Sequence, residues 1–88
     1  IGKFDGEIYR LAKELFRKEE YEDSTSLFFL LCTVHPRVPE YWLSLGLSLE
    51  KLRNYEEAVE AYICAVSISD HVKVAYVNIY NCLCLLNS

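Results

Sequence analysis

Four cysteines and two histidines are the side chains best suited to metal binding or nucleophilic chemistry. They are Cys32, His35, Cys64, His71, Cys82 and Cys84. A structural zinc site usually takes its ligands in close pairs such as Cys-x-x-Cys, and this chain has no such pair. Cys82 and Cys84 are two residues apart, so a helix would place them about 200° apart, on opposite sides. Cys32 and Cys64 fall near equivalent helix positions where a small buried apolar residue fits. We interpret the cysteines as structural thiols; the alternative, a zinc site, would appear as stoichiometric zinc in a metal analysis.

No pattern in the sequence supports catalysis. Neither a serine nor a cysteine has the flanking residues of a recognisable nucleophile motif. The three glycines, Gly2, Gly6 and Gly46, are scattered, so no glycine-rich phosphate loop is present. The glutamate pairs at 19–20 and 56–57 are interpreted as helix-start or turn charges. We therefore expect a protein that is not an enzyme and needs no cofactor.

Composition narrows the classes of partner. With 52% hydrophobic and 25% charged residues, the 88 residues are expected to form one small globular domain. The net charge of −4 gives no electrostatic reason to bind nucleic acid. The uncharged run from Val74 to Ser88 is short for a bilayer span, so we expect no membrane insertion.

The helices that would position the cysteines and histidines are most clearly indicated in the stretch 39–70. It reads as two amphipathic helices joined by a tight turn, with a large residue, Leu, Gly and Leu followed by Tyr, Ala, an aromatic residue and Ala. These residues are Trp42, Leu45, Gly46, Leu49, Tyr55, Ala58, Tyr62 and Ala65. That pattern is typical of the tetratricopeptide repeat (TPR), in which small residues let two helix backbones approach closely.

A shift of 34 residues, the length of this repeat, exposes a second copy. The coincident pairs are Ile8 with Trp42, Leu11 with Leu45, Ala12 with Gly46, Leu15 with Leu49, Tyr21 with Tyr55, and Phe28 with Tyr62. A further shift places residues 76–83 over the start of a third repeat, with Tyr80 at the small-residue position. The sequence therefore predicts an all-α TPR superhelix.

Five helices are predicted, at about 5–18, 22–35, 40–53, 56–68 and 71–87. They make a single TPR domain over 1–88, with repeat 1 at about 5–38, repeat 2 at about 39–72 and the first helix of a third at about 73–88. Leu83 and Leu86 fall where a partner helix should cover them. We expect either self-association through 71–88 or a further helix, and a chain that is a fragment of a longer protein.

The first helices of successive TPRs line a concave groove. The register places Arg17, Glu40, Val74 and Leu85 there, together with the residues predicted to bind peptide. The predicted peptide-binding residues are Tyr9, Lys13, Phe16, Leu43, Leu47, Glu50, Lys51, Val77 and Asn81. Most form an apolar stripe suited to an extended apolar peptide, with Lys13, Glu50 and Lys51 as a polar rim. The alternative is that part of the stripe packs against a preceding helix.

One known type of TPR binding site, which holds a C-terminal carboxylate, does not match this sequence. TPR co-chaperones that grip a C-terminal carboxylate use Lys and Asn at fixed groove positions. This chain has Tyr9, Lys13, Ser44, Val74 and Asn78 at those positions. We therefore expect no carboxylate clamp.

A narrower resemblance covers nearly the whole chain. The residues that carry it are Tyr21-Glu22-Asp23, Phe28 with Leu31-Cys32, Tyr41-Trp42 with Leu45-Gly46, Tyr55 with Ala58, and Asn81-Cys82-Leu83. In these the chain resembles the class II type III secretion chaperones, the SycD/LcrH/IpgC group. It departs from their pattern at Ser24, usually Ala, and at Tyr80, usually small.

The resemblance implies a cytoplasmic bacterial chaperone, often dimeric. Its groove would bind a short proline- and leucine-containing segment of a hydrophobic translocator and keep that client soluble before export. The alternative is a scaffold module of a larger protein, which uses the same groove or the convex face for protein–protein assembly.

Overall fold

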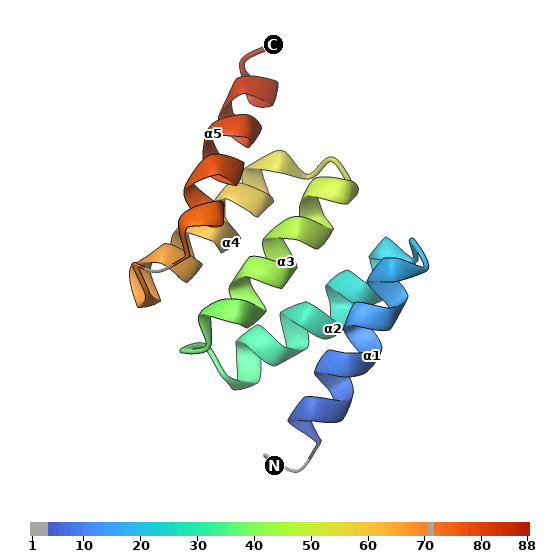
Figure 1. Cartoon of the computed structure of the whole chain (residues 1–88). Coiled ribbons are helices and arrows are strands. Elements are labelled where there is room, and N and C mark those ends of the chain that lie inside the picture. Colours follow the sequence, from blue (N-terminus) through green and yellow to red (C-terminus); the bar gives the residue numbers. More distant parts are fainter. Residues whose placement is uncertain (1–3, 71) are drawn as a thin grey trace.

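The computed structural model describes residues 4–70 and 72–88, and this part of the chain contains five α-helices and no strand. The helices are α1 (Asp5–Arg17), α2 (Tyr21–Val34), α3 (Pro39–Lys51), α4 (Tyr55–Ile68) and α5 (Lys73–Leu86). Each helix packs against the next along the chain. Figure 1 shows α1, α3 and α5 in the nearer layer and α2 and α4 behind them. This arrangement confirms the predicted TPR architecture of two helix pairs plus a fifth helix.

The helix boundaries lie close to those expected from the sequence. α2 and α4 each begin at the repeat tyrosine, Tyr21 or Tyr55, one residue earlier than expected. α5 begins at Lys73 rather than at 71. His71, one of the candidate metal ligands, lies outside the described residues.

The turns within the two repeats have the same backbone geometry. Glu19 and Arg53 are 34 positions apart, and both have positive φ, 64° and 65°. After each, an amide bonds back to the preceding helix: Glu20 N to Leu15 O and Asn54 N to Leu49 O, both 2.9 Å. This is the Schellman pattern, in which a left-handed residue satisfies the last carbonyls of a helix. The usual residue there is glycine, so the sequence gives no signal for it.

α3 and α4 approach each other closely at Gly46 of α3. A Cβ built on Gly46 would lie 2.5 Å from Cε1 of Tyr62, a side chain that is fully buried on α4. Ala12, the equivalent of Gly46 in repeat 1, is also fully buried, as is Ala58. Small residues at these positions let the helices pack closely, as the repeat pattern predicted.

Ser24, which departs from the family pattern, takes part in a buried hydroxyl network between α2 and α3. Ser24 and Ser48 are both fully buried, and their Oγ atoms are 2.9 Å apart. The Ser24 hydroxyl donates to the Tyr21 carbonyl at 3.1 Å, and Thr25 Oγ1 also contacts Ser48 Oγ. The serine is therefore tolerated because its hydroxyl is fully partnered in the helix interface.

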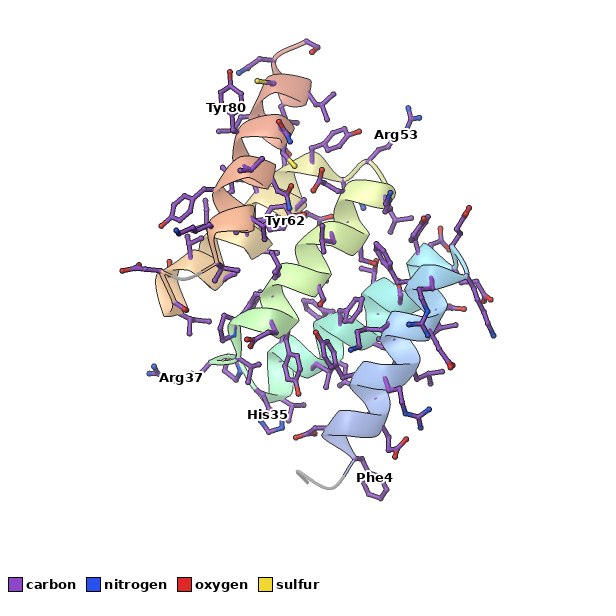
Figure 2. All side chains as sticks on the ribbon, viewed as in Figure 1. Phe4, His35, Arg37, Arg53, Tyr62 and Tyr80 are labelled. Atoms are coloured by element: carbon purple, nitrogen blue, oxygen red, sulfur yellow. The ribbon has the colours of Figure 1, made fainter. Side chains whose placement is uncertain are left out.

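The two ends of the stack expose apolar side chains. Leu45 of α3 is buried against α2, whereas its repeat equivalent Leu11 is 49% exposed. On α5, Leu83, Leu86 and Tyr80 are exposed, and Figure 2 shows Tyr80 pointing away from α4. The departure at Tyr80 thus lies outside the α4–α5 contact. Self-association or continuation through 71–88 stays a prediction.

Gly46→Ala should destabilise the fold even though alanine is the better helix former. The propensity gain of about 1 kcal/mol is outweighed by forcing the buried Tyr62 ring to move, for a net loss of about 2 kcal/mol. Urea unfolding followed by circular dichroism measures it. The matched control is Gly6→Ala, where a Cβ meets nothing within 4 Å; it should be neutral or stabilising. Equal stability of the two variants would contradict the packing.

Ser24→Ala and Ser48→Ala should each lower the free energy of unfolding by about 1 kcal/mol, because each leaves a buried hydroxyl short of a partner. The double variant should lose less than the sum of the two. Ser26→Ala is the control, because that exposed hydroxyl bonds only its own helix, to the Glu22 carbonyl. Strict additivity in the double variant would show that the two serines do not interact.

Candidate functional site

We call the layer of α1, α3 and α5 the front layer and that of α2 and α4 the rear layer. In the front layer, a first cavity of about 210 Å³ lies between α1 and α3. It is lined by Lys13, Phe16, Arg17, Phe28, Ser44 and Leu47. Phe28 is a buried α2 side chain that forms its floor. The cavity therefore combines an apolar interior with basic side chains, those of Lys13 and Arg17, from one helix.

A second cavity of about 290 Å³ lies between α3 and α5. It is lined by Leu47, Glu50, Lys51, Tyr55, Asn78 and Leu85. Leu47 lines both cavities and is partly exposed. We refer to the two cavities together as the front groove; Leu47 is the residue that lines both.

An aromatic cluster supports the α1 side of the front groove. The ring centroid of Tyr9 lies 5.1 Å from that of Tyr41 and 6.1 Å from that of Phe28. Its hydroxyl lies 3.4 Å from Ser44 Oγ, and Lys13 Nζ lies 4.6 Å from its ring centroid. These contacts fix Tyr9 as part of the wall and hold the Lys13 ammonium over an aromatic face.

Glu50 is tied into the protein interior and is not a free rim charge. Its carboxylate accepts a hydrogen bond from the hydroxyl of the buried Tyr62. Burial raises the pKa of Tyr62 far above its usual value, and the Glu50 carboxylate adds to the effect. The hydroxyl therefore stays protonated and holds Glu50 in place, so Lys13 and Lys51 remain as the exposed charges of the predicted rim.

The structure brings together part of the predicted peptide-binding set. Lys13, Phe16, Leu47, Glu50 and Lys51 line the front groove. Tyr9 forms the adjoining wall, and Leu43 packs partly buried against the core. Val77 and Asn81 are exposed on α5 and line neither cavity.

Four groove residues were missed by the sequence-based set: Phe28, Ser44, Tyr55 and Asn78. Phe28 comes from a second helix, and periodicity predicts only that it is buried, not that its ring is reached from the front. Ser44 and Asn78 were considered only as positions of a carboxylate clamp. In the structure Ser44 lines the first cavity and Asn78 the second.

The cysteines differ in their surroundings. Cys32 and Cys82 are buried, whereas Cys84 is exposed, so Cys82 and Cys84 do point to opposite sides of α5. Cys64 is only partly buried, unlike Cys32, because its position on α4 opens onto a surface cavity. Within residues 4–70 and 72–88, no three His, Cys, Asp or Glu side chains gather as metal ligands would.

His35 has contacts that suit a structural role. Its Nε2 contacts Oδ2 of Asp5 at the start of α1, and its ring centroid lies 6.5 Å from that of Tyr41. Nearby, the Trp42 indole donates a hydrogen bond of 2.8 Å to the Pro36 carbonyl. These contacts fasten the turn between α2 and α3 to its neighbours.

The five-helix fold is that of a TPR protein. No protein-family model matches the sequence, and no curated protein matches it in sequence. None of the helices in the described part of the chain is long and apolar enough to cross a membrane.

Solved structures place the fold more narrowly. The chain is structurally similar to type III secretion translocator chaperones. A chain of the CopN–Scc3 complex matches it with a TM-score of 0.95 and 25% identity over 100% of this chain. The Yersinia enterocolitica type III secretion translocator chaperone SycD matches with a TM-score of 0.94 and 20% identity over 99%.

A third structure is a complex with a client peptide. It is SycD of Yersinia enterocolitica bound to a peptide of the translocator YopD, with a TM-score of 0.90 and 21% identity over 93% of this chain. The present chain spans 52%, 60% and 63% of the lengths of these three chains.

Alkaline pH should destabilise the fold through its buried thiols. Burial raises the pKa of Cys32 to about 12 and that of Cys82 to about 11, from an ordinary 9.0. The pKa of each thiol is higher in the folded than in the unfolded chain. The stabilisation that the neutral thiols give to the folded state is therefore complete below pH 9, and it is lost as pH rises from 9 toward 11 or 12. Each thiol can cost up to about 1.4 kcal/mol per pH unit in that window.

Cys32→Ala should therefore flatten the fall in unfolding free energy between pH 9 and 10.5, measured by urea titration at each pH. Cys84→Ala is the matched control, since folding leaves that side chain exposed. If both variants kept the slope of the unaltered chain, the buried thiol would not be the cause.

Proposed function

We propose that this chain is the client-binding part of a bacterial type III secretion chaperone. In this role the front groove holds an extended apolar segment of a hydrophobic translocator and keeps that client soluble in the cytoplasm before export. The observation that carries the proposal is the front groove itself, two cavities that share the apolar side chain of Leu47, in a chain with the fold of translocator chaperones. The protein acts by binding and not by catalysis.

The residues of the groove suggest how a client would be held. Phe16, Phe28 and Leu47 offer apolar surface in the first cavity, and Leu47 and Leu85 continue it into the second. An extended peptide can place alternate side chains in the two cavities, while its remaining polar groups stay in water. Lys13, Arg17 and Lys51 stand at the edges, where they can meet acidic or carbonyl groups of the client.

The proposed peptide-binding residues are those of the groove and its wall. Tyr9 and Leu43 would act by shaping the groove from behind, whereas Val77 and Asn81 would contact only a client that extends beyond the second cavity along α5. The similar structure of SycD with a YopD peptide supports an extended protein segment as the ligand class. A homodimer would use the exposed apolar face of α5, which includes Tyr80, Leu83 and Leu86.

The second candidate is a scaffold module of a longer protein. The exposed apolar side chains at both ends of the stack favour it, because repeats in an array cover these faces with neighbours. A parent chain of several hundred residues with many further repeats would support the scaffold. A short parent chain whose co-expression solubilises a hydrophobic partner would support the chaperone.

Leu47→Glu should weaken client binding by roughly 100-fold or more, because a hydrated carboxylate would replace the apolar side chain that both cavities share. Leu43→Glu should act in the same direction through the groove wall. The measurement is fluorescence polarisation with a labelled peptide from the translocator that the chain solubilises on co-expression. Helicity by circular dichroism should change little for Leu47→Glu, since that side chain is already partly exposed.

The matched control is Leu30→Glu on α2. This leucine is 44% exposed, against 37% for Leu47, and lies outside the front groove. It should leave peptide affinity unchanged. Normal binding by Leu47→Glu, or equal loss in both variants, would show that the groove assignment is wrong.

A further inference from the structure

A third cavity, larger than those of the front groove, lies on the opposite side of α3. It measures about 560 Å³ and runs between α2 and α4, with α3 as its floor. We call it the rear trough. Its lining residues are Thr25, Ser26, Phe29, Trp42, Leu45, Leu49, Leu52, Asn54, Glu57, Glu60, Ala61 and Cys64. Its volume is within the range of ligand-binding pockets.

The floor of the rear trough is apolar, and the α2 wall adds one aromatic ring. Leu45 and Leu49 are buried α3 side chains, and Trp42 lies partly buried beside them. Phe29 on the α2 wall is 60% exposed. Phe29 therefore adds exposed aromatic surface next to the buried leucines of the floor.

The other wall is acidic, and so is the whole rear layer. α2 and α4 together carry Glu22, Asp23, Glu56, Glu57 and Glu60, and all nine Lys and Arg residues of the chain lie outside these two helices. Among the described residues the ion pairs are Glu7 with Arg10 and Asp5 with His35. Glu57 and Glu60 therefore line the rear trough without a cationic partner from the described chain.

A separate effect of this charge is seen at Cys64. Burial raises the pKa of the Cys64 thiol, and the neighbouring Glu60 carboxylate raises it further. The Glu60 carboxylate is thus close enough to act on a side chain that lines the trough.

We propose that the rear trough binds a cationic amphipathic segment of a partner protein. Its apolar side chains would enter between Phe29 and the α3 floor, and its Lys or Arg side chains would meet Glu57 and Glu60. Charge complementarity selects this occupant: an apolar cavity with an unpaired acidic wall attracts a segment that brings both apolar and basic side chains.

A second copy of this chain is the poorer match. α5 has the largest exposed apolar face, but its only basic residue is Lys73, at its first position. α1 has basic residues, but Asp5, Glu7 and Glu14 are interleaved with them. Neither helix presents a continuous basic and apolar face to the trough.

The rear trough is independent of the proposed client site. Leu47 lines the front groove, whereas Leu45 and Leu49 line the trough, so the α3 backbone separates the two. Both sites can therefore be occupied together. A failure of one proposal leaves the other standing.

The chain carries its own reporters for this site. Trp42 is its single tryptophan and lines the trough, so its fluorescence should change when the trough fills. Cys64 also lines the trough, whereas the exposed Cys84 lies on α5 and serves as an internal control for alkylation. The probe is a synthetic amphipathic peptide of Leu and Lys, and its control is the same peptide with Glu in place of Lys.

We expect the Leu/Lys peptide to change Trp42 fluorescence saturably and to slow alkylation of Cys64 but not of Cys84. Binding should weaken as salt is raised. Glu57→Gln with Glu60→Gln should weaken it roughly 5- to 10-fold, as expected for two partly exposed charge pairs. Glu7→Gln with Glu14→Gln changes the net charge equally on α1 and should have little effect.

Other results would overturn the proposal. They are equal binding of the Leu/Lys and Leu/Glu peptides, equal loss in the two double variants, or peptide binding that leaves both Trp42 and Cys64 unaffected. Leu47→Glu distinguishes the two sites, because it should abolish client binding in the front groove and leave the Trp42 response to the Leu/Lys peptide intact.

Discussion

The contact of the Tyr62 ring with the α3 backbone at Gly46 is the constraint on which the rest of the structure depends. The absence of a side chain at Gly46 lets a full tyrosine ring lie against α3 and be completely buried. From there the Tyr62 hydroxyl reaches Glu50 in the last turns of α3. One close approach therefore fixes both the spacing of α3 and α4 and the placement of a groove residue.

The layered arrangement follows from the close spacing of α3 and α4. It leaves α3 with two faces that line cavities. Residues two positions apart on a helix point about 200° apart, so Leu47 faces the front groove while Leu45 and Leu49 face the rear trough. The faces differ in chemistry because the basic residues lie outside α2 and α4. The same helix stack thus offers an apolar groove with basic edges on one side and an apolar trough with an acidic wall on the other.

The repeat architecture also explains which apolar side chains are exposed at the two ends of the helix stack. Leu45 is buried because α2 precedes α3 in space, and Leu11 is exposed because no described helix lies in the same place before α1. The departures from the repeat pattern are absorbed locally. Ser24 is satisfied by Ser48 in the α2–α3 interface, and Tyr80 lies away from the α4–α5 contact.

The sequence by itself determined the helical repeat. The 34-residue spacing of Ala12 with Gly46 and of Phe28 with Tyr62 specified two helix pairs, and a further shift of the same length indicated the fifth helix. It also placed Phe16, Leu47 and Lys51 on one face, since helical periodicity orders residues around each axis.

Only the tertiary structure decided which of those residues share a cavity. Phe28 reaches the front groove from the rear layer, Glu50 is drawn inward by Tyr62, and Val77 lies beyond both cavities, all through contacts between helices that periodicity within one helix does not encode. Helical periodicity did not predict the rear trough either. Its acidic residues look like ordinary helix-start and surface charges until α2, α3 and α4 bring them beside Phe29 and Trp42.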